Sequence, residues 1–175
     1  MVGIDRRRLG SVLAVAALVF AGCADAPPPE FVSKGDKFKV LFGAAPQISE
    51  RTVGGMRSVA YTVEAPGGER SVTITELPVK GDEPPGFASW ALESAKSDLI
   101  RAARGKEESS ASHVLAGKYP GREFSARVSQ GIPGKMRARI WLVGARLYQV
   151  MVIGTDSYTD SDDAAAFLDS FQLTE

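Results

Sequence analysis

The chain has 175 residues with 21 basic and 21 acidic side chains, so its formal net charge is zero. This balance lacks the positive field with which nucleic-acid-binding domains attract phosphates, so no nucleic-acid partner is expected. One histidine and one cysteine cannot supply the ligands of a zinc site, and a single cysteine excludes an internal disulfide. We therefore expect no metal site.

The first 22 residues have the organisation of an export signal. Three arginines at positions 6–8 precede an apolar run from Leu9 to Phe20, which is shorter than the about 20 apolar residues of a membrane-spanning helix. The small residues Ala21 and Gly22 follow and lead directly to Cys23. This pattern is similar to the bacterial lipobox, in which signal peptidase II cleaves before a cysteine that carries diacylglycerol. We expect residues 1–22 to be a lipoprotein signal peptide and Cys23 to be the lipidation site. The alternatives are cleavage by the ordinary signal peptidase and a thiol inside an uncleaved anchor helix.

Acylation of Cys23 would make the lipid bilayer a partner, on the extracytoplasmic side of a bacterial cell membrane or outer membrane. Residues 23–30 form a tether, and the three prolines at 27–29 favour an extended polyproline II spacer. The remaining residues, 31–175, have the length of one domain, which we expect to lie close to the bilayer.

The first half of this domain is expected to contain three strands and one helix. Residues 37–42, 57–63 and 70–77 have the pattern of strands, and the turn at 65–68 joins the last two into a hairpin. A helix should follow between Pro84 and Gly105, because one apolar stripe unites Phe87, Trp90, Ala91, Ala95, Leu99 and Ala102. Residues 106–112 are expected to be a polar loop.

Residues 122–154 predict a meander of three antiparallel strands. One face carries Phe124, Ala126 and Val128, followed in the next strand by Met136, Ala138, Ile140 and Leu142. If core residues of the first strand lie opposite core residues of the second, the residue numbers of each cross-strand pair sum to an even number. The turn between these two strands then contains three or five residues. Gly144-Ala145 fits a type II′ turn, which pairs Trp141 with Tyr148 and Ile140 with Gln149. Gln149 is then the one polar residue on the core face.

The opposite face of the meander carries the candidate binding residues, Arg127, Arg137, Arg139, Trp141 and Tyr148. Arg127 is expected opposite Arg137 or Arg139, and opposed like charges destabilise a sheet unless something neutralises them. One interpretation is a shallow site for an anionic or aromatic group, because arginine and aromatic side chains suit anchoring contacts. In the other, Glu123 and neighbouring acids balance the arginines while a helix covers the aromatic residues.

A final helix is expected after Asp160 or Ser161, either of which can cap it. Its apolar stripe is Ala164, Phe167, Leu168 and Phe171. The aspartates at 156, 160, 162 and 163 lack the glycine and distal glutamate of a calcium loop, so we interpret them as residues that favour a helix N-terminus.

Three short motifs support a family resemblance: residues 38–40 (Phe-Lys-Val), 146–148 (Arg-Leu-Tyr) and 167–171 (Phe-Leu-Asp-Ser-Phe). With the order strand, hairpin, helix, meander and helix, they resemble the PsbP-like group of bacterial lipoproteins over most of residues 31–175. The resemblance implies an α+β fold, with an antiparallel sheet of about six strands in an α/β/α sandwich. Known members of that fold are mostly assembly or binding proteins, and an extrinsic subunit of photosystem II is a relative by fold. The resemblance implies no catalytic residue.

The residues give no support for catalysis. His113 follows a run of serines in an expected exposed loop, and no nucleophile elbow or phosphate-binding glycine loop occurs. No pattern brings Glu64, Glu69 and Glu76 together as an acid-base pair. We therefore expect no cofactor, no enzymatic activity, and an envelope lipoprotein that acts as a binding or assembly module for an envelope protein. The alternatives are a carrier or sensor of a small anionic or lipid-like ligand and, less favoured, an envelope hydrolase.

Overall fold

The structure, a computed structural model, describes residues 30–79, 83–129 and 133–175 and contains two antiparallel sheets. The seven strands of the larger sheet are, in spatial order, β3 (Gln47–Val53), β4 (Met56–Ala65), β5 (Gly68–Glu76), β9 (Arg146–Gly154), β8 (Gly134–Val143), β7 (Tyr119–Val128) and β6 (Lys106–Leu115). The smaller sheet consists of β1 (Phe31–Ser33), β2 (Phe38–Val40) and β10 (Gln172–Leu173). The predicted leader, Cys23 and nearly all of the tether lie outside the described residues.

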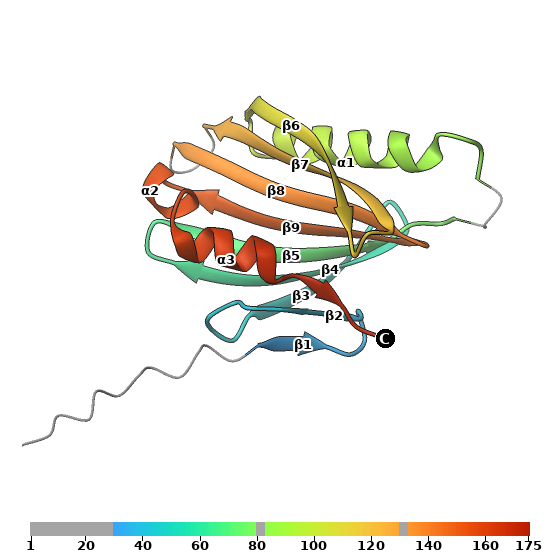
Figure 1. Cartoon of the computed structure of the whole chain (residues 1–175), viewed down its shortest axis with the longest axis horizontal. Helices are drawn as coiled ribbons and strands as arrows, with labels where there is room; N and C mark the ends of the chain where they lie inside the picture. Colours follow the sequence, from blue (N-terminus) through green and yellow to red (C-terminus); the bar gives the residue numbers. More distant parts are fainter. Residues whose placement is uncertain (1–29, 80–82, 130–132) are drawn as a thin grey trace, which may run out of the picture.

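Helices pack on both sides of the larger sheet (Figure 1). Helix α1 (Phe87–Ala102) lies on one face, over β7 and β8. The short α2 (Asp156–Thr159), α3 (Asp162–Ser170) and the smaller sheet lie on the other. Among the helices of the described ranges, none combines the length and apolar character needed to cross a bilayer. The predicted α+β class with an antiparallel sheet is therefore confirmed, although the strand number of about six was too low.

The predicted hairpins are confirmed, and so is the predicted register of the hairpin between β8 and β9. Ala65 pairs with Gly68 across the β4–β5 turn, and Val143 pairs with Arg146 across the β8–β9 turn. In the latter, Gly144 has a φ of 58°, the left-handed conformation that a type II′ turn needs at its first position. Val128 pairs with Gly134, which leaves five residues between β7 and β8, one of the two predicted lengths.

One prediction about the polar segments was wrong, and one polar strand was missed. Residues 106–112, expected to be a loop, begin the edge strand β6, and β3 at the other edge was not predicted. Both strands carry mostly exposed residues, because an edge strand pairs on one side only and neither of its faces is deeply covered here. Polar composition therefore concealed them. The short strands β1 and β10 and helix α2 were also not predicted.

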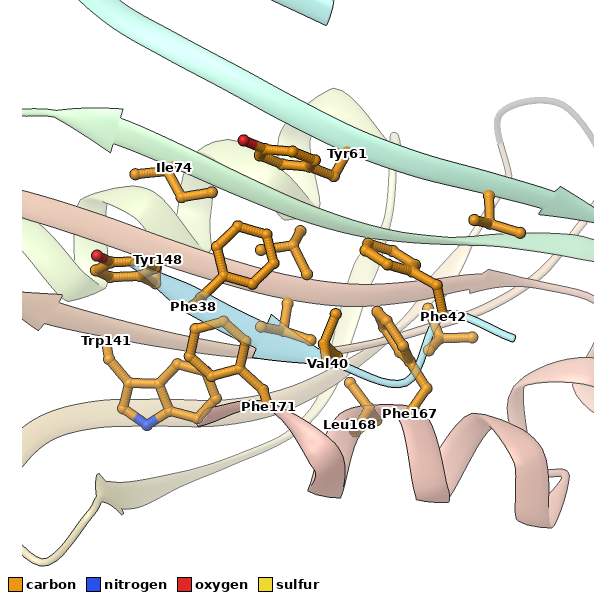
Figure 2. Close-up of a cluster of buried hydrophobic side chains, with 14 of the residues drawn as sticks. Phe38, Val40, Phe42, Tyr61, Ile74, Trp141, Tyr148, Phe167, Leu168 and Phe171 are labelled. Carbon is orange, nitrogen blue, oxygen red and sulfur yellow. The ribbon is translucent and has the colours of Figure 1, made fainter. Parts of the chain in front are cut away.

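The larger sheet separates two hydrophobic cores. One lies under α1 and contains the expected apolar face of the meander, including Phe124, Met136 and Ile140. The other lies between the sheet, α3 and the smaller sheet, and is built largely from aromatic side chains (Figure 2). In this second core, hereafter the aromatic core, the ring of Trp141 stacks on Phe171 with 5.2 Å between centroids and an interplanar angle of 7°. Strands β8 and β9 are consequently buried on both faces.

Candidate functional site

The aromatic residues of the predicted binding face are buried. Trp141 is 1% exposed and Tyr148 is 2% exposed, both inside the aromatic core. Phe171, which follows α3, packs against both rings. The structure thus corrects the interpretation of a shallow surface site: a helix and the smaller sheet cover this face, as the alternative interpretation holds.

The arginines of the same face are paired within the protein. Arg127 lies opposite Lys135, not opposite Arg137 or Arg139 as predicted, and its guanidinium contacts Glu108 at 3.1 Å and Asp156 at 2.6 Å. The numbers of paired residues in β7 and β8 still sum to an even number, as predicted. The partner of Arg127, however, lies two residues before the nearer of its two predicted partners. Asp160 neutralises Lys135 at 2.8 Å, so no external anion is needed to balance the two cations.

The other two arginines bind the helices that cover the face. Arg137 donates to the carbonyl of Thr159 at the end of α2, at 3.0 Å. Arg139 donates to the carbonyl of Leu168 in α3 at 3.0 Å and contacts Asp169 at 2.7 Å. Because the last carbonyls of a helix lack intrahelical partners, a cation there stabilises the helix end. These residues therefore attach α2 and α3 to the sheet.

His113 lies in β6, not in an exposed loop as expected. Its Nδ1 accepts a hydrogen bond from the indole Nε1 of Trp141 at 2.9 Å. Burial and then the positive charge of Arg139 lower the pKa of His113, so the neutral ring is favoured. His113 thus satisfies the one polar atom of a buried indole.

A buried carboxylate that the sequence did not indicate occurs at Asp36, which is 3% exposed. Its side chain accepts hydrogen bonds from the Tyr61 hydroxyl at 2.5 Å and from Arg57 at 3.0 Å, and its carbonyl accepts one from Tyr148 at 2.9 Å. Burial raises the pKa of Asp36, but the hydrogen bonds from Tyr61 and Arg57 outweigh it and hold this pKa below its usual value. All its partners belong to the domain, which identifies the group as a link between the β1–β2 loop and the sheet.

An apolar groove of about 490 Å³, hereafter the α1 groove, lies beside α1. Its wall on the helix includes Phe87, Trp90 and Ala91, and its floor includes Leu77 and Leu147 from the sheet side. Trp90 is 66% exposed, so the prediction that it belongs to the buried stripe of this helix was wrong. The rings of Trp90 and Phe87 lie 5.9 Å apart between centroids and form an aromatic rim.

A second hollow, of about 520 Å³, lies at the other end of α1 and is lined partly by Glu64 and Glu69. These two carboxylates are direct cross-strand neighbours in β4 and β5, which corrects the expectation that nothing places two of these glutamates together. Burial and then the charge of Glu64 raise the pKa of Glu69. Glu76, the third of these residues, instead contacts Arg57 and Arg146.

The acidic residues near the last helix form ion pairs and caps. Ser161 caps α3 through its side chain, as one of the two predicted caps, and Asp162 and Asp163 occupy the first turn. Within the described parts of the chain, no three histidine, cysteine, aspartate or glutamate side chains form a group suited to a metal ion.

Comparisons with known proteins reveal similarity of fold. No protein-family model matches the chain, and no curated protein matches it. The solution structure of cyanobacterial PsbP (CyanoP) from Synechocystis sp. PCC 6803 has 14% identity and a TM-score of 0.57, over 89% of this chain and 98% of that one. A crystal structure of PA94, a Pseudomonas aeruginosa protein of unknown function, has 11% identity and a TM-score of 0.44, over 67% and 90% of the two chains. The likeness to CyanoP extends over nearly its whole length, and we conclude that this chain has the PsbP-like fold.

Proposed function

We propose that the protein is a membrane-anchored lipoprotein of the bacterial cell envelope and that its domain is a non-catalytic binding or assembly module. The basic and apolar leader and the position of Cys23 support the anchor. Strand β1 begins at Phe31, so only the short segment 24–30 separates the first element of the fold from Cys23. This spacing keeps the domain near the bilayer surface.

The observation that carries the binding role is the exposure of Trp90 at the rim of the α1 groove. Tryptophan is enriched in the contacts that dominate binding energy, because it buries a large area with few rotatable bonds. Phe87 lies beside it and extends the apolar surface. We propose the α1 groove as the surface that meets an envelope partner, in place of the buried face first predicted.

The anchor is tested by comparing the wild-type protein with Cys23→Ser. The wild type should sediment with membranes and incorporate labelled palmitate, whereas Cys23→Ser should do neither. A Cys23→Ser protein that is still labelled and still sediments with membranes would contradict the lipoprotein proposal.

The binding role is tested with a photo-crosslinking residue at position 90 of the membrane-bound protein. It should capture one partner in stoichiometric yield, and the same crosslinker at Ile48 should capture none. Ile48 is a suitable control because it is 61% exposed but lies on the edge strand β3, outside the groove. Equal capture from both positions would contradict a specific role of the groove.

A second candidate function, a carrier or sensor of a small ligand, is supported by the size of the α1 groove. Its volume of about 490 Å³ lies within the range of roughly 300–1,000 Å³ typical of ligand pockets. Its apolar lining suits a lipid-like molecule better than an anion.

A further inference from the structure

Arg70 is a half-buried cation that forms no ion pair with a carboxylate of the described residues. It lies in β5, and its guanidinium packs 5.8 Å from the ring centroids of Tyr158 and Phe167. Its hydrogen bonds reach neutral oxygen atoms, the Tyr158 hydroxyl at 3.3 Å and the carbonyl of Phe42 at 3.4 Å. Both are longer than the about 2.9–3.0 Å of an ordinary N–H···O hydrogen bond, so the guanidinium is weakly satisfied.

The other half-buried arginines of the described ranges have stronger partners. Carboxylates pair with Arg57, Arg122, Arg139 and Arg146, and Arg137 donates to the carbonyl at the end of α2. A cation that is partly withdrawn from water without a counter-charge is destabilised. Arg70 is therefore the half-buried arginine with an unused capacity to bind an anion.

The guanidinium lies at a hollow of about 420 Å³, hereafter the Arg70 pocket. The turn between β4 and β5 and the starts of α2 and α3 enclose it, at one end of the larger sheet (Figure 1). Its lining includes the hydroxyl-bearing residues Thr155, Ser157 and Tyr158. A Cβ atom at Gly67 would lie 3.2 Å from Oγ1 of Thr155, so the glycine preserves space beside this hydroxyl.

The hydroxyl groups of the pocket have hydrogen atoms left to donate. The Tyr158 hydroxyl accepts from Arg70, and no group in the described ranges accepts its hydrogen. The hydroxyls of Thr155 and Ser157 share one hydrogen bond of 3.2 Å, so only one of their two hydrogens is used. Ser161 adds none, because its hydroxyl already donates to the carbonyl of Tyr158. With the remaining N–H groups of Arg70, these donors suit a ligand whose oxygens only accept hydrogen bonds.

Asp163 is the acidic residue in the lining of the Arg70 pocket, and it limits the affinity for an anion. It lies in the first turn of α3 and does not pair with Arg70. Its charge repels an entering anion, so the site suits a group that is present at high local concentration. The phosphates of a lipid bilayer meet this condition for a membrane-anchored protein.

The Arg70 pocket also lies near the start of the domain. Phe42, whose carbonyl accepts from Arg70, packs against Phe31 with 5.6 Å between ring centroids. Phe31 is the first residue of β1, and eight peptide units separate it from Cys23. At about 3.1 Å per residue in polyproline II, this length keeps Phe31 within roughly 25 Å of the proposed acylation site.

We infer that the Arg70 pocket is a binding site for a phosphate group, which accepts from the guanidinium of Arg70 and from the hydroxyls of Tyr158 and of Thr155 or Ser157. The headgroups of the anchoring bilayer are one source of this group, and a soluble phosphate ester is the other. The site itself is independent of the anchor, whereas the lipid source rests on the proposed function. Binding of a headgroup would fix which side of the domain faces the membrane.

The site is tested by titrating glycerol 1-phosphate into the full chain carrying Cys23→Ser, at constant ionic strength. A ligand of the folded state raises the melting temperature, and the size of the rise gives an apparent Kd. Arg70→Gln should raise this Kd about tenfold or more, because hydrogen bonds to charged groups are the stronger ones. Arg51→Gln is the matched control: it removes the same charge from an exposed position of β3 outside the pocket and should change nothing.

Phosphate also stabilises folded proteins in general through exclusion from their surface, so the difference between these variants is the measured quantity. Equal responses of Arg70→Gln and Arg51→Gln would overturn the inference.

The position of the phosphate is tested with Asp163→Asn, which removes the adverse charge from the lining of the pocket. This variant should bind glycerol 1-phosphate about twofold more tightly or better. A gain of affinity cannot arise from partial unfolding, so this result remains decisive even if Arg70→Gln lowers the stability of the fold. Unchanged or weaker binding by Asp163→Asn would contradict the assignment of the ligand to this pocket.

The source of the phosphate is tested with the acylated wild type in vesicles of phosphatidylcholine, with and without phosphatidic acid. Phosphatidic acid exposes its phosphate, whereas choline covers that of phosphatidylcholine with a cation. Phosphatidic acid should raise the melting temperature of the wild type and of Arg51→Gln but not that of Arg70→Gln. If only glycerol 1-phosphate acts through Arg70, the site stands and its ligand is a soluble phosphate ester. If neither acts through Arg70, the inference fails, while the anchor and the α1 groove retain their separate tests.

Discussion

The indole N–H of Trp141 donates to Nδ1 of His113 over 2.9 Å, although strand β7 lies between their two strands. Gly121 of β7 pairs with both residues and has no side chain to separate them. A Cβ atom at this position would collide with Cδ1 of Trp141 and with the carbonyl oxygen of Ile140. The buried indole therefore reaches its acceptor only because glycine occupies position 121.

Replacing Gly121 with alanine should destabilise the domain by about 1–3 kcal/mol, the usual effect of overpacking a core. The two neighbouring groups are a ring buried in the aromatic core and a backbone carbonyl, so neither can move freely. Thermal unfolding measures the loss, with Gly35→Ala as the control, since an added Cβ at Gly35 meets no atom within 4 Å. Equal melting temperatures for the two variants would contradict the role of Gly121.

The His113 acceptor should make stability sensitive to mild acid. Protonation places a hydrogen on Nδ1, which then faces the indole N–H instead of accepting from it. Burial and then Arg139 lower the pKa of His113 in the folded protein, so the unfolded chain binds the proton more tightly. The neutral His113 ring therefore contributes its full stabilisation at a pH well above 6.5, the ordinary pKa of histidine. This stabilisation is lost as the pH falls through 6.5 and below.

This dependence can be isolated by comparing melting temperatures of the wild type and His113→Gln over a pH series. Glutamine keeps an acceptor near the indole but does not titrate, so its melting temperature should fall less between neutral pH and mild acid. Glu123 and Asp169 also lie in the field of His113 and are the same in both proteins. If the melting temperatures of the two proteins fall in parallel as the pH is lowered, protonation of His113 does not contribute to the loss of stability, and the prediction is contradicted.

Alternation of apolar residues was sufficient to predict the meander, because a one-residue slip would have moved its whole apolar set to the other face. It could not show what covers each face. Trp141, Leu142 and Val143 are successive residues, and such a run suits either a strand buried on both sides or an exposed aromatic face. The structure resolves this through Phe171 and α3, whose packing across a long sequence separation no local pattern contains.

The candidate site shows the same limit. The helical period correctly grouped Phe87 and Ala91, but Trp90 lies at the border of the same stripe, and its exposure depends on where α1 rests on the sheet. Gln149 was visible in the sequence as the exception among core positions, which was the one local signal of the groove. Asp36 gave no signal, because an aspartate after a glycine also suits an ordinary turn.

The arginines of the predicted face should prove to be structural. Arg139→Gln removes contacts to Glu123, Asp169 and the carbonyl of Leu168 from a side chain that is only 14% exposed. We expect a loss of about 1–3 kcal/mol in chemical denaturation, because the carbonyl of Leu168, a residue that is 1% exposed, is left without its donor. Arg127→Gln is the matched control: its pairs are exposed, so its loss should stay below about 1 kcal/mol. A larger loss for Arg127→Gln than for Arg139→Gln would contradict this assignment.

The opposed carboxylates Glu64 and Glu69 should reduce stability at neutral pH, because directly paired like charges repel across a sheet. Burial and then Glu64 raise the pKa of Glu69, so the folded protein binds this proton more tightly than the unfolded chain. The stabilising effect of protonation is thus present in acid and is lost as pH rises through and above the ordinary value of 4.5. Glu69→Gln should therefore stabilise the domain by roughly 0.2–1 kcal/mol at neutral pH, and the gain should vanish in acid.

Glu64→Gln separates the two causes of this effect, since it removes the repulsion but leaves the less exposed Glu69 carboxylate in place. Its gain should be smaller than that of Glu69→Gln, with both measured as melting temperatures over one pH series. A gain of about 1 kcal/mol corresponds to a rise of roughly 2–4 °C for a chain of this size. If Glu69→Gln instead destabilises the domain at neutral pH, the ionised Glu69 carboxylate stabilises the fold, and the predicted repulsion between Glu64 and Glu69 is contradicted.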